Sequence, residues 1–236
     1  MSTSAAVCSD CGRPLGRLTL ELPDVVGPRV FLAECLCLAD RREAAANLHA
    51  RVQRLLSVSG ISKRHRDATF ETFEAPPPIR PILDVCRRFV MDFPRDGRGL
   101  TLGGPPRTGK THLVVAVTRA LIERGFAGVV LNAHRLALTS GGFEEMLRLA
   151  GRCDHLVLDD LGRGCVTESV LEALEFVVNR RYEDRLATSV TTNLSLEALR
   201  HRLGEPILDR LAETNDAYWC QWPSYRRRSL SEEGRP

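Results

Sequence analysis

The sequence predicts an α/β fold with a mainly parallel sheet around a phosphate-binding loop. Short apolar, β-rich runs alternate with amphipathic helical segments through most of the chain, which is typical of a parallel sheet covered by helices. A glycine-rich stretch joins one of these strands to one of these helices. A proline cluster at residues 75–81 precedes this regular alternation, so we expect a separate region before it.

Composition limits the classes of protein to consider. A chain of 236 residues can bury one core, or one core and a small appendage. No apolar run approaches the length of a membrane span, and the N-terminus lacks the basic start and apolar stretch of a secretory signal. We therefore expect a cytoplasmic protein without membrane contact, in which cysteines stay reduced. The net charge of +3 is too small to indicate nucleic-acid binding by itself.

Residues 1–37 are expected to form a small zinc-binding module. Two strand-like runs, at residues 17–22 and 28–34, predict a hairpin that lies between two cysteine pairs. Four thiolates close in space suit tetrahedral Zn²⁺, which would stabilise a piece too small for a core of its own. The alternative is ordinary buried or free thiols, as assumed for the other four cysteines. The predicted zinc ligands are Cys8, Cys11, Cys35 and Cys37.

A linker follows this module. Residues 38–59 are rich in alanine and arginine and carry apolar residues along one helical face, which predicts one helix closed by Gly60. Residues 38–75 are therefore interpreted as a linker helix and lead-in, and residues 76–236 as the α/β domain.

Within the α/β domain, strands and helices are expected in alternation. Apolar β-rich runs predict the strands, amphipathic spacing predicts the helices, and Gly125 is expected to end the first helix. The predicted strands are residues 99–104, 128–133, 155–160 and 188–193, and the predicted helices are residues 111–125, 143–152, 167–185 and 195–203.

Residues 104–111 fit the Walker A pattern of a phosphate-binding loop, Gly-x-x-x-x-Gly-Lys-Thr, with a strand before it and a helix after it. Its glycines let backbone N–H groups turn toward phosphate oxygens, and the helix N-terminus adds positive potential. Lys110 is expected to reach the β- and γ-phosphates of ATP, and the Thr111 hydroxyl to hold Mg²⁺. A chance glycine turn is the alternative, which the strand–loop–helix context disfavours. The predicted nucleotide-binding residues here are Gly104, Pro105, Pro106, Arg107, Thr108, Gly109, Lys110, Thr111 and His112.

Such a loop needs an acidic partner, which we expect on a neighbouring strand. Asp159 stands at the C-terminal end of a predicted strand, where it would bind the Mg²⁺ shell and belong to the nucleotide site. Asp160 occupies the position where a hydrolytic ATPase usually carries a base that orients water, although many relatives have glutamate there. Either aspartate could instead cap the next element.

Several motifs occur together in the order of a known family. They lie at residues 59–73, 103–113, 156–162, 190–199, 203–213 and 222–228. In this order they resemble DnaC/DnaI-type helicase loaders, which are AAA+ ATPases of an IstB-like superfamily. The ending, LGEPILDRL followed after a short strand by WPSYRRR, is the most specific part of the resemblance. The resemblance implies a three-layer AAA+ fold for residues 76–236, and ATP hydrolysis that is slow and stimulated by assembly or DNA.

The resemblance also implies roles for three polar residues. Asn193 matches sensor 1, a polar group beside the γ-phosphate, and Arg226 matches sensor 2. Arg210 matches the arginine finger, which reaches the nucleotide of a neighbouring subunit and so implies head-to-tail self-association. Without the resemblance, Asn193 could cap the following helix and Arg210 could be a surface arginine.

The function implied by the resemblance is that of a helicase loader. Such a protein binds a hexameric replicative helicase and assists its loading on single-stranded DNA. DnaI-type loaders carry a zinc-binding N-terminal module that docks on the helicase, which favours the same role for residues 1–37. Two other functions stay open, namely an IstB-like transposition helper that wraps duplex DNA, and an adaptor whose ATP state controls binding with negligible hydrolysis.

Direct contact with single-stranded DNA is a weaker inference. The basic segments at residues 62–66 and 225–228 could meet phosphates, or could be solvated charges. DnaC-like loaders carry a helical insertion for single-stranded DNA before the Asp159 strand, and the corresponding interval at residues 134–153 looks shorter here.

Overall fold

The structure is a computed structural model. It describes residues 8, 17–20, 29–32, 36–74, 77–94, 96–132, 148, 150–164 and 167–222. The chain divides into two compact units, residues 1–51 and residues 52–236. None of the described helices is long and apolar enough to cross a membrane.

The first unit contains the hairpin that the sequence predicts. Strands β1 (Arg17–Leu20) and β2 (Arg29–Leu32) pair in antiparallel fashion, with Arg17 opposite Leu32. Helix α1 (Leu36–Val58) follows, and Gly60 adopts a φ of 71° just beyond its end. The zinc expectation is not tested, because Cys11, Cys35 and the Cys37 side chain lie outside the described residues.

The second unit is built on a five-stranded sheet in which every described pairing is parallel, so the predicted α/β fold class is confirmed. The strands lie in the order β4-β5-β6-β3-β7. Their bounds are β3 (Gly99–Gly103), β4 (Gly128–Asn132), β5 (His155–Asp159), β6 (Ala187–Thr191) and β7 (Asn215–Trp219).

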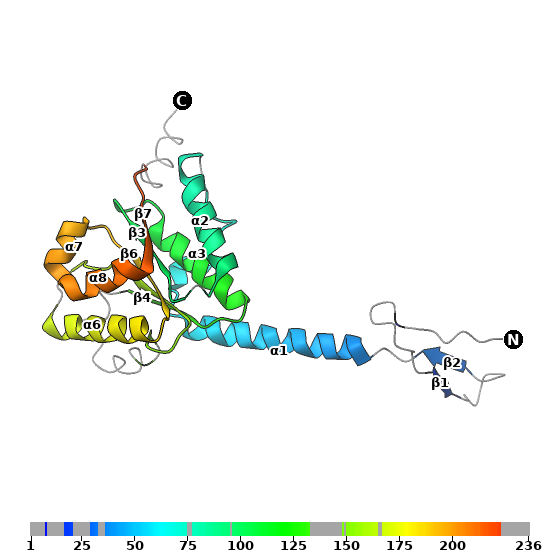
Figure 1. The fold of residues 1–236 in the computed structure, drawn as a ribbon. Helices are drawn as coiled ribbons and strands as arrows, with labels where there is room; N and C mark the ends of the chain where they lie inside the picture. Colours follow the sequence, from blue (N-terminus) through cyan, green and yellow to red (C-terminus); the bar gives the residue numbers. More distant parts are fainter. Residues whose placement is uncertain are drawn as a thin grey trace, which may run out of the picture. The chain divides into compact units, whose positions relative to one another are not determined.

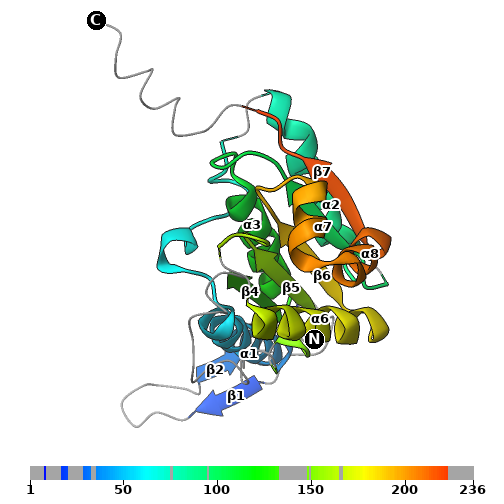
Figure 2. The same ribbon diagram turned by 90° about the vertical axis from the view of Figure 1, so that its left-hand side faces the viewer.

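Helices cover both faces of this sheet and give three layers. One face carries α2 (Arg80–Asp92) and α3 (Lys110–Glu123), as Figure 1 shows. The other face carries α6 (Glu168–Glu183), α7 (Leu196–Leu203) and α8 (Glu205–Thr214), which are turned toward the viewer in Figure 2. Strand β5 serves both cores, because Val157 packs with the α2–α3 side, and Leu156 and Leu158 pack with the α6–α8 side.

Helix α2 is an element that the sequence prediction did not include. Its buried residues are Ile82, Leu83, Cys86, Phe89 and Val90, which have helical spacing. Pro81 lies in its first turn, where proline is tolerated, so the proline cluster leads directly into this helix. The predicted helix at residues 143–152 lies mostly outside the described residues.

The lead-in packs into the second unit. Two short 3₁₀ helices, Lys63–His65 and Pro77–Ile79, lie in and just after it. Ser59 O accepts a hydrogen bond of 2.7 Å from the N–H of Val130 on edge strand β4. A Cβ at Gly60 would lie 2.4 Å from the Val130 carbonyl oxygen, so only glycine fits this approach.

A buried histidine links the strands of the sheet. His155 is fully buried, with Nε2 2.8 Å from Ser189 Oγ and Nδ1 3.4 Å from Thr118 Oγ1. Ser189 Oγ accepts from the N–H of Leu100, which leaves its hydroxyl hydrogen for His155 Nε2. Thr118 donates its own hydroxyl hydrogen to Val114 O. These partners satisfy a neutral imidazole and provide no acceptor for a second proton.

Stability is therefore expected to fall in mild acid. Burial lowers the pKa of His155 from 6.5 to about 3, and the positive charge of Arg181 adds to this. The unfolded chain then binds more protons than the folded chain between these values, so stability is complete above pH 6.5 and is lost below it. Between pH 6.5 and pH 5 this amounts to about 2 kcal/mol, measurable as a lower urea midpoint.

Matched variants separate this effect from other groups. His155→Gln should flatten the pH dependence of the urea midpoint, although it also lowers stability at neutral pH. His201→Gln, on an exposed position of α7, should keep the wild-type dependence. An unchanged pH dependence in His155→Gln would contradict the assignment.

Candidate functional site

The carboxyl ends of the parallel strands surround a cavity of about 1220 Å³. The loop between β3 and α3 forms part of its wall and follows an unusual backbone path. Gly104, Arg107 and Gly109 have φ values of 128°, 68° and 90°. A Cβ at Gly104 would lie 2.5 Å from Cys220 O, so this residue needs both the backbone freedom and the missing side chain of glycine. The loop thus places the first turn of α3 at the cavity.

Lys110 is folded back onto its own loop. Its Nζ donates to Gly104 O at 2.8 Å and Pro105 O at 2.7 Å, and reaches Thr108 Oγ1 at 3.3 Å. It also donates to Asn193 Oδ1 at 2.8 Å. Burial lowers the pKa of Lys110, although the nearby Cys220, Asp160 and Asp159 oppose this. The ammonium group therefore lies at the cavity on neutral oxygens, which a phosphate could replace as stronger acceptors.

Asp159, at the end of β5, and Thr111, in the first turn of α3, lie together, although β5 is not the strand next to β3. Asp159 Oδ1 accepts from Thr111 Oγ1 at 2.8 Å and from Thr191 Oγ1 at 2.7 Å. The expectation of an acidic partner on a strand adjacent to the loop strand is wrong, because β6 lies between β3 and β5. Thr191 at the end of β6 bridges this gap. Nothing in the sequence prediction singled out Thr191.

Asp160 is held from two sides. It has a φ of 57°, and its Oδ1 accepts from Asn193 Nδ2 at 2.7 Å. Its Oδ2 accepts from Arg163 Nη1 at 3.0 Å. Since Asn193 Oδ1 accepts from Lys110, a continuous series of polar contacts joins Arg163, Asp160, Asn193 and Lys110. Sequence reasoning missed Arg163, although it stands only three residues after Asp160.

His112 connects α3 to the lead-in. Its Nε2 lies 2.9 Å from Thr69 O, and its ring centroid lies 5.1 Å from that of Phe73. Arg64 and His65, from the basic segment at residues 62–66, line the cavity. Burial lowers the pKa of His65, against the attraction of Asp159. At least these two basic residues face the site.

One residue near the C-terminus contacts the loop. Trp222 Nε1 donates to Thr108 O at 2.8 Å and lines the cavity, a contact that the motif WPSYRRR did not suggest. Trp222 therefore braces the phosphate-binding loop. Arg226 lies outside the described residues, so its sensor 2 role stays a prediction.

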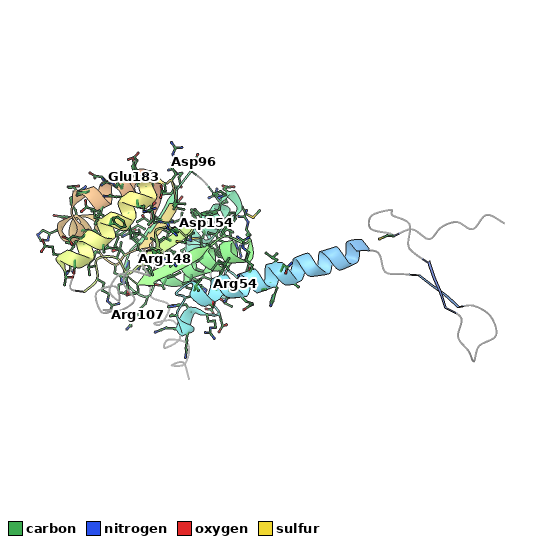
Figure 3. The ribbon with its side chains drawn as sticks, turned by 90° about the horizontal axis from the view of Figure 1, so that it is seen from below. Arg54, Asp96, Arg107, Arg148, Asp154 and Glu183 are labelled. Carbon is green, nitrogen blue, oxygen red and sulfur yellow. The ribbon has the colours of Figure 1, made fainter. Side chains whose placement is uncertain are left out.

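Arg210 lies far from this cavity. It lines a second cavity of about 480 Å³, beside the amino ends of β3 and β6 and together with Asp96, Arg98, Glu183 and Glu213. Five-residue strands separate the two ends of the sheet by roughly 16 Å. Figure 3 shows the same separation, with Arg107 of the loop on one side of the domain and Asp96 and Glu183 on the other. Arg210 cannot reach the cavity of its own chain.

One pair of oxygen donors fits a divalent cation. The Thr111 hydroxyl, which lines the cavity, contacts the Asp159 carboxylate, and both are hard oxygen ligands of the kind that Mg²⁺ prefers. Among the described residues, no group of three or more His, Cys, Asp or Glu side chains forms a metal cluster. Any Mg²⁺ here would need further oxygens from a bound nucleotide and water.

Comparisons with known proteins agree with this geometry. The family described as IstB-like ATP binding protein matches residues 33–233. The replicative helicase loader DnaC of Escherichia coli strain K12 is 28% identical over 242 residues, covering 94% of this chain and 98% of that protein. The crystal structure of the DnaC helicase loader superposes with a TM-score of 0.62 and 29% identity, covering 68% of this chain and 100% of that one. The crystal structure of DnaI gives a TM-score of 0.63 at 20% identity, covering 72% of this chain and 98% of that one.

Proposed function

The chain belongs to the IstB-like ATP-binding protein family, and from its similarity to the DnaC helicase loader we propose that it is an ATP-dependent helicase loader. In this role it binds a hexameric replicative helicase and assists its loading on single-stranded DNA during replication. The main supporting observation is that Lys110 and Thr111 line one cavity, with Asp159 hydrogen-bonded to Thr111, in a chain that is similar to DnaC along nearly its whole length.

ATP is the proposed substrate, with its phosphates on the loop at residues 104–111. Lys110 would exchange its present carbonyl partners for β- and γ-phosphate oxygens. In hydrolysis a water oxygen bonds to the γ-phosphorus while the bond to the β–γ bridging oxygen breaks. Asp160 orients that water and accepts its proton, and ADP and inorganic phosphate leave. Asn193, already bonded to both Lys110 and Asp160, would sense the γ-phosphate.

Thr111 and Asp159 would hold Mg²⁺, which when bound neutralises charge on the β- and γ-phosphates. Their mutual hydrogen bond holds the two oxygens next to each other in the absence of the ion. Thr191 fixes the Asp159 carboxylate from the other side. These contacts limit the reorganisation that metal binding requires.

Self-association is proposed to be head-to-tail. Arg210 is separated from its own nucleotide cavity by the length of the sheet, so a neighbouring chain is the site that it could serve. Arg226 is proposed to act as sensor 2 in the same assembly. Hydrolysis that needs Arg210 in trans would be slow in the isolated chain.

The proposed zinc module at residues 1–37 would dock on the helicase, with residues 38–75 as linker and lead-in to the ATPase domain. Because β1 and β2 are antiparallel and Arg17 pairs with Leu32, the chain enters and leaves the hairpin at one end. The two cysteine pairs precede and follow that end in sequence. Elemental analysis should find one Zn²⁺ per chain, and the Cys8→Ser/Cys11→Ser double variant should contain none. A folded, metal-free wild type would exclude the module.

Co-purification with the replicative helicase, with and without ATP, tests the proposed function. The wild type should form a stable complex and should place the helicase on circular single-stranded DNA in an ATP-dependent way. Arg180→Ala, on an exposed position of α6, is a control that should behave like the wild type.

Three outcomes would contradict all or part of the proposed function. No complex in either nucleotide state removes the function. Preferential binding of duplex DNA and a transposase would favour the transposition helper. The IstB-like description of the matching family supports this alternative. Helicase loading that depends on ATP binding but proceeds at an undiminished rate without ATP turnover would favour the adaptor. Asp160, at a position where many ATPases carry glutamate, supports this alternative.

A further inference from the structure

The turn after β5 presents Arg163 to Asp160. Arg163 N–H donates to Asp160 O at 3.2 Å, which closes the turn. Gly162 and Gly164 each have a φ of 81°, a conformation that suits glycine. Arg202 on α7 donates to the carbonyl oxygens of both glycines, at 3.0 and 2.9 Å. The residue between those glycines is therefore held in place by its backbone, while its side chain is 70% exposed.

The hydrogen bonds of Asp160 occupy both of its carboxylate oxygens. Asn193 holds Oδ1 and the Arg163 guanidinium holds Oδ2, so each carboxylate oxygen already has a donor. A carboxylate that is to take a proton from water must present an oxygen to that water. The ion pair with Arg163 competes with this, and because Arg163 is largely exposed, the competition is weak and reversible.

Arg210 has a carboxylate beside it on α8. Glu213 stands three residues after Arg210 on α8, so both side chains project from one face of that helix. Tyr182 donates its hydroxyl to Glu213, with both carboxylate oxygens at 2.9 Å, which fixes the carboxylate beside the second cavity without cancelling its charge. Arg163 is exposed at the rim of the nucleotide cavity, which is the face that Arg210 of a neighbour would approach.

We propose that Arg163 is a positioning residue that restrains Asp160 in the isolated chain, and that Glu213 of a neighbouring copy takes over Arg163 when Arg210 arrives. The exchange pairs one exposed arginine with a new carboxylate and frees Asp160 Oδ2 for water. It also supplies charge complementarity between the two faces, since one offers Arg163 and the other offers Glu213. This inference rests on the ATP hydrolysis and head-to-tail association of the proposed function, and it names the contact that couples them.

Phosphate release by the full chain tests the restraint, measured from dilute to concentrated protein without helicase. In dilute protein, Arg163→Gln should raise kcat about two- to five-fold, which is the range expected on losing an exposed ion pair. The kcat of Arg163→Lys should lie between those of the wild type and Arg163→Gln. Arg180→Gln, which removes another exposed arginine from a pair with an aspartate, should leave kcat unchanged. Arg163→Gln/Asp160→Asn should lose the gain.

The exchange itself is tested by epistasis. Glu213→Gln should reduce the rise of kcat with protein concentration, and adding Arg163→Gln should restore turnover to at least the level of Arg163→Gln alone. A merely structural role of Glu213 would not be rescued in this way. Intrinsic tryptophan fluorescence, to which Trp222 at the cavity contributes, reports nucleotide binding by each variant and identifies any that fails to fold.

Clear outcomes would overturn the inference. These are an Arg163→Gln kcat at or below wild type, a change confined to KM, a gain that survives Asp160→Asn, or a double variant as defective as Glu213→Gln. An absence of turnover in every variant also overturns it, because Arg163→Gln should reveal activity. Failure to bind a helicase would refute the loader alone and leave these measurements unaffected.

Discussion

Replacing Arg181 by methionine is expected to destabilise the protein by about 3–5 kcal/mol. Arg181 is fully buried in α6, and its guanidinium is surrounded by neutral acceptors. Nη1 donates to Ala150 O at 2.6 Å and Cys153 O at 2.8 Å, Nη2 donates to Ala187 O at 2.7 Å, and Nε donates to Thr188 Oγ1 at 2.9 Å. Burial lowers the pKa of Arg181, but the variant would leave several buried acceptors without a donor.

Urea denaturation at pH 7.5 measures this loss, and the adjacent residue provides the control. Arg180→Met makes the same substitution one position earlier on a side chain that is 52% exposed, so its effect should stay within about 0.5 kcal/mol. A domain with a typical total stability of about 5–15 kcal/mol would be close to unfolding in the Arg181 variant at physiological temperature. A loss below about 1 kcal/mol would show that the acceptors find water or other donors.

Arg181 also shows why part of the site could not be predicted. Its acceptors belong to the turn before β5 and to the start of β6, the two strands whose far ends carry Asp159 and Asn193. Those contacts depend on strand order, and the sequence does not encode strand order in any local pattern. Thirty-one arginines also gave no reason to single out one that lies in the interior.

Local sequence patterns were sufficient to predict the central strands and the phosphate-binding loop. The apolar runs gave β3 to β6 nearly to the residue, since strands buried on both faces read as continuous apolar stretches. Lys110, Thr111 and Asp159 could be proposed from the sequence because their spacing and position after strands are typical of a nucleotide site, and the structure places Thr111 against Asp159. Thr191, Arg163 and Trp222 were missed because each acts through a contact across the sheet or across a turn.

The loss of Arg210 is expected to have the largest effect on activity. Arg210→Ala should lower turnover in the assembled state about 10³-fold, because an arginine supplied in trans stabilises charge on the transferring phosphoryl group by at least that factor. ATP binding should persist, since Arg210 lines the cavity at the opposite ends of the strands and its Nη1 donates to Pro206 O within its own helix. Nucleotide titration and phosphate release on the same samples measure both quantities.

A mixing experiment decides whether Arg210 acts between chains. Lys110→Ala removes the nucleotide site but keeps Arg210, and Arg210→Ala does the reverse, so each chain supplies what its neighbour lacks. Equal mixtures should recover turnover well above either variant alone, whereas chains with both substitutions should not recover when mixed with Lys110→Ala. Arg200→Ala, an exposed arginine paired with Glu205 on α8, should keep assembled turnover within about two-fold of wild type. Weaker ATP binding with unchanged turnover at saturating ATP in Arg210→Ala would show that the residue serves its own chain, and the asymmetry between the two cavities would then need another explanation.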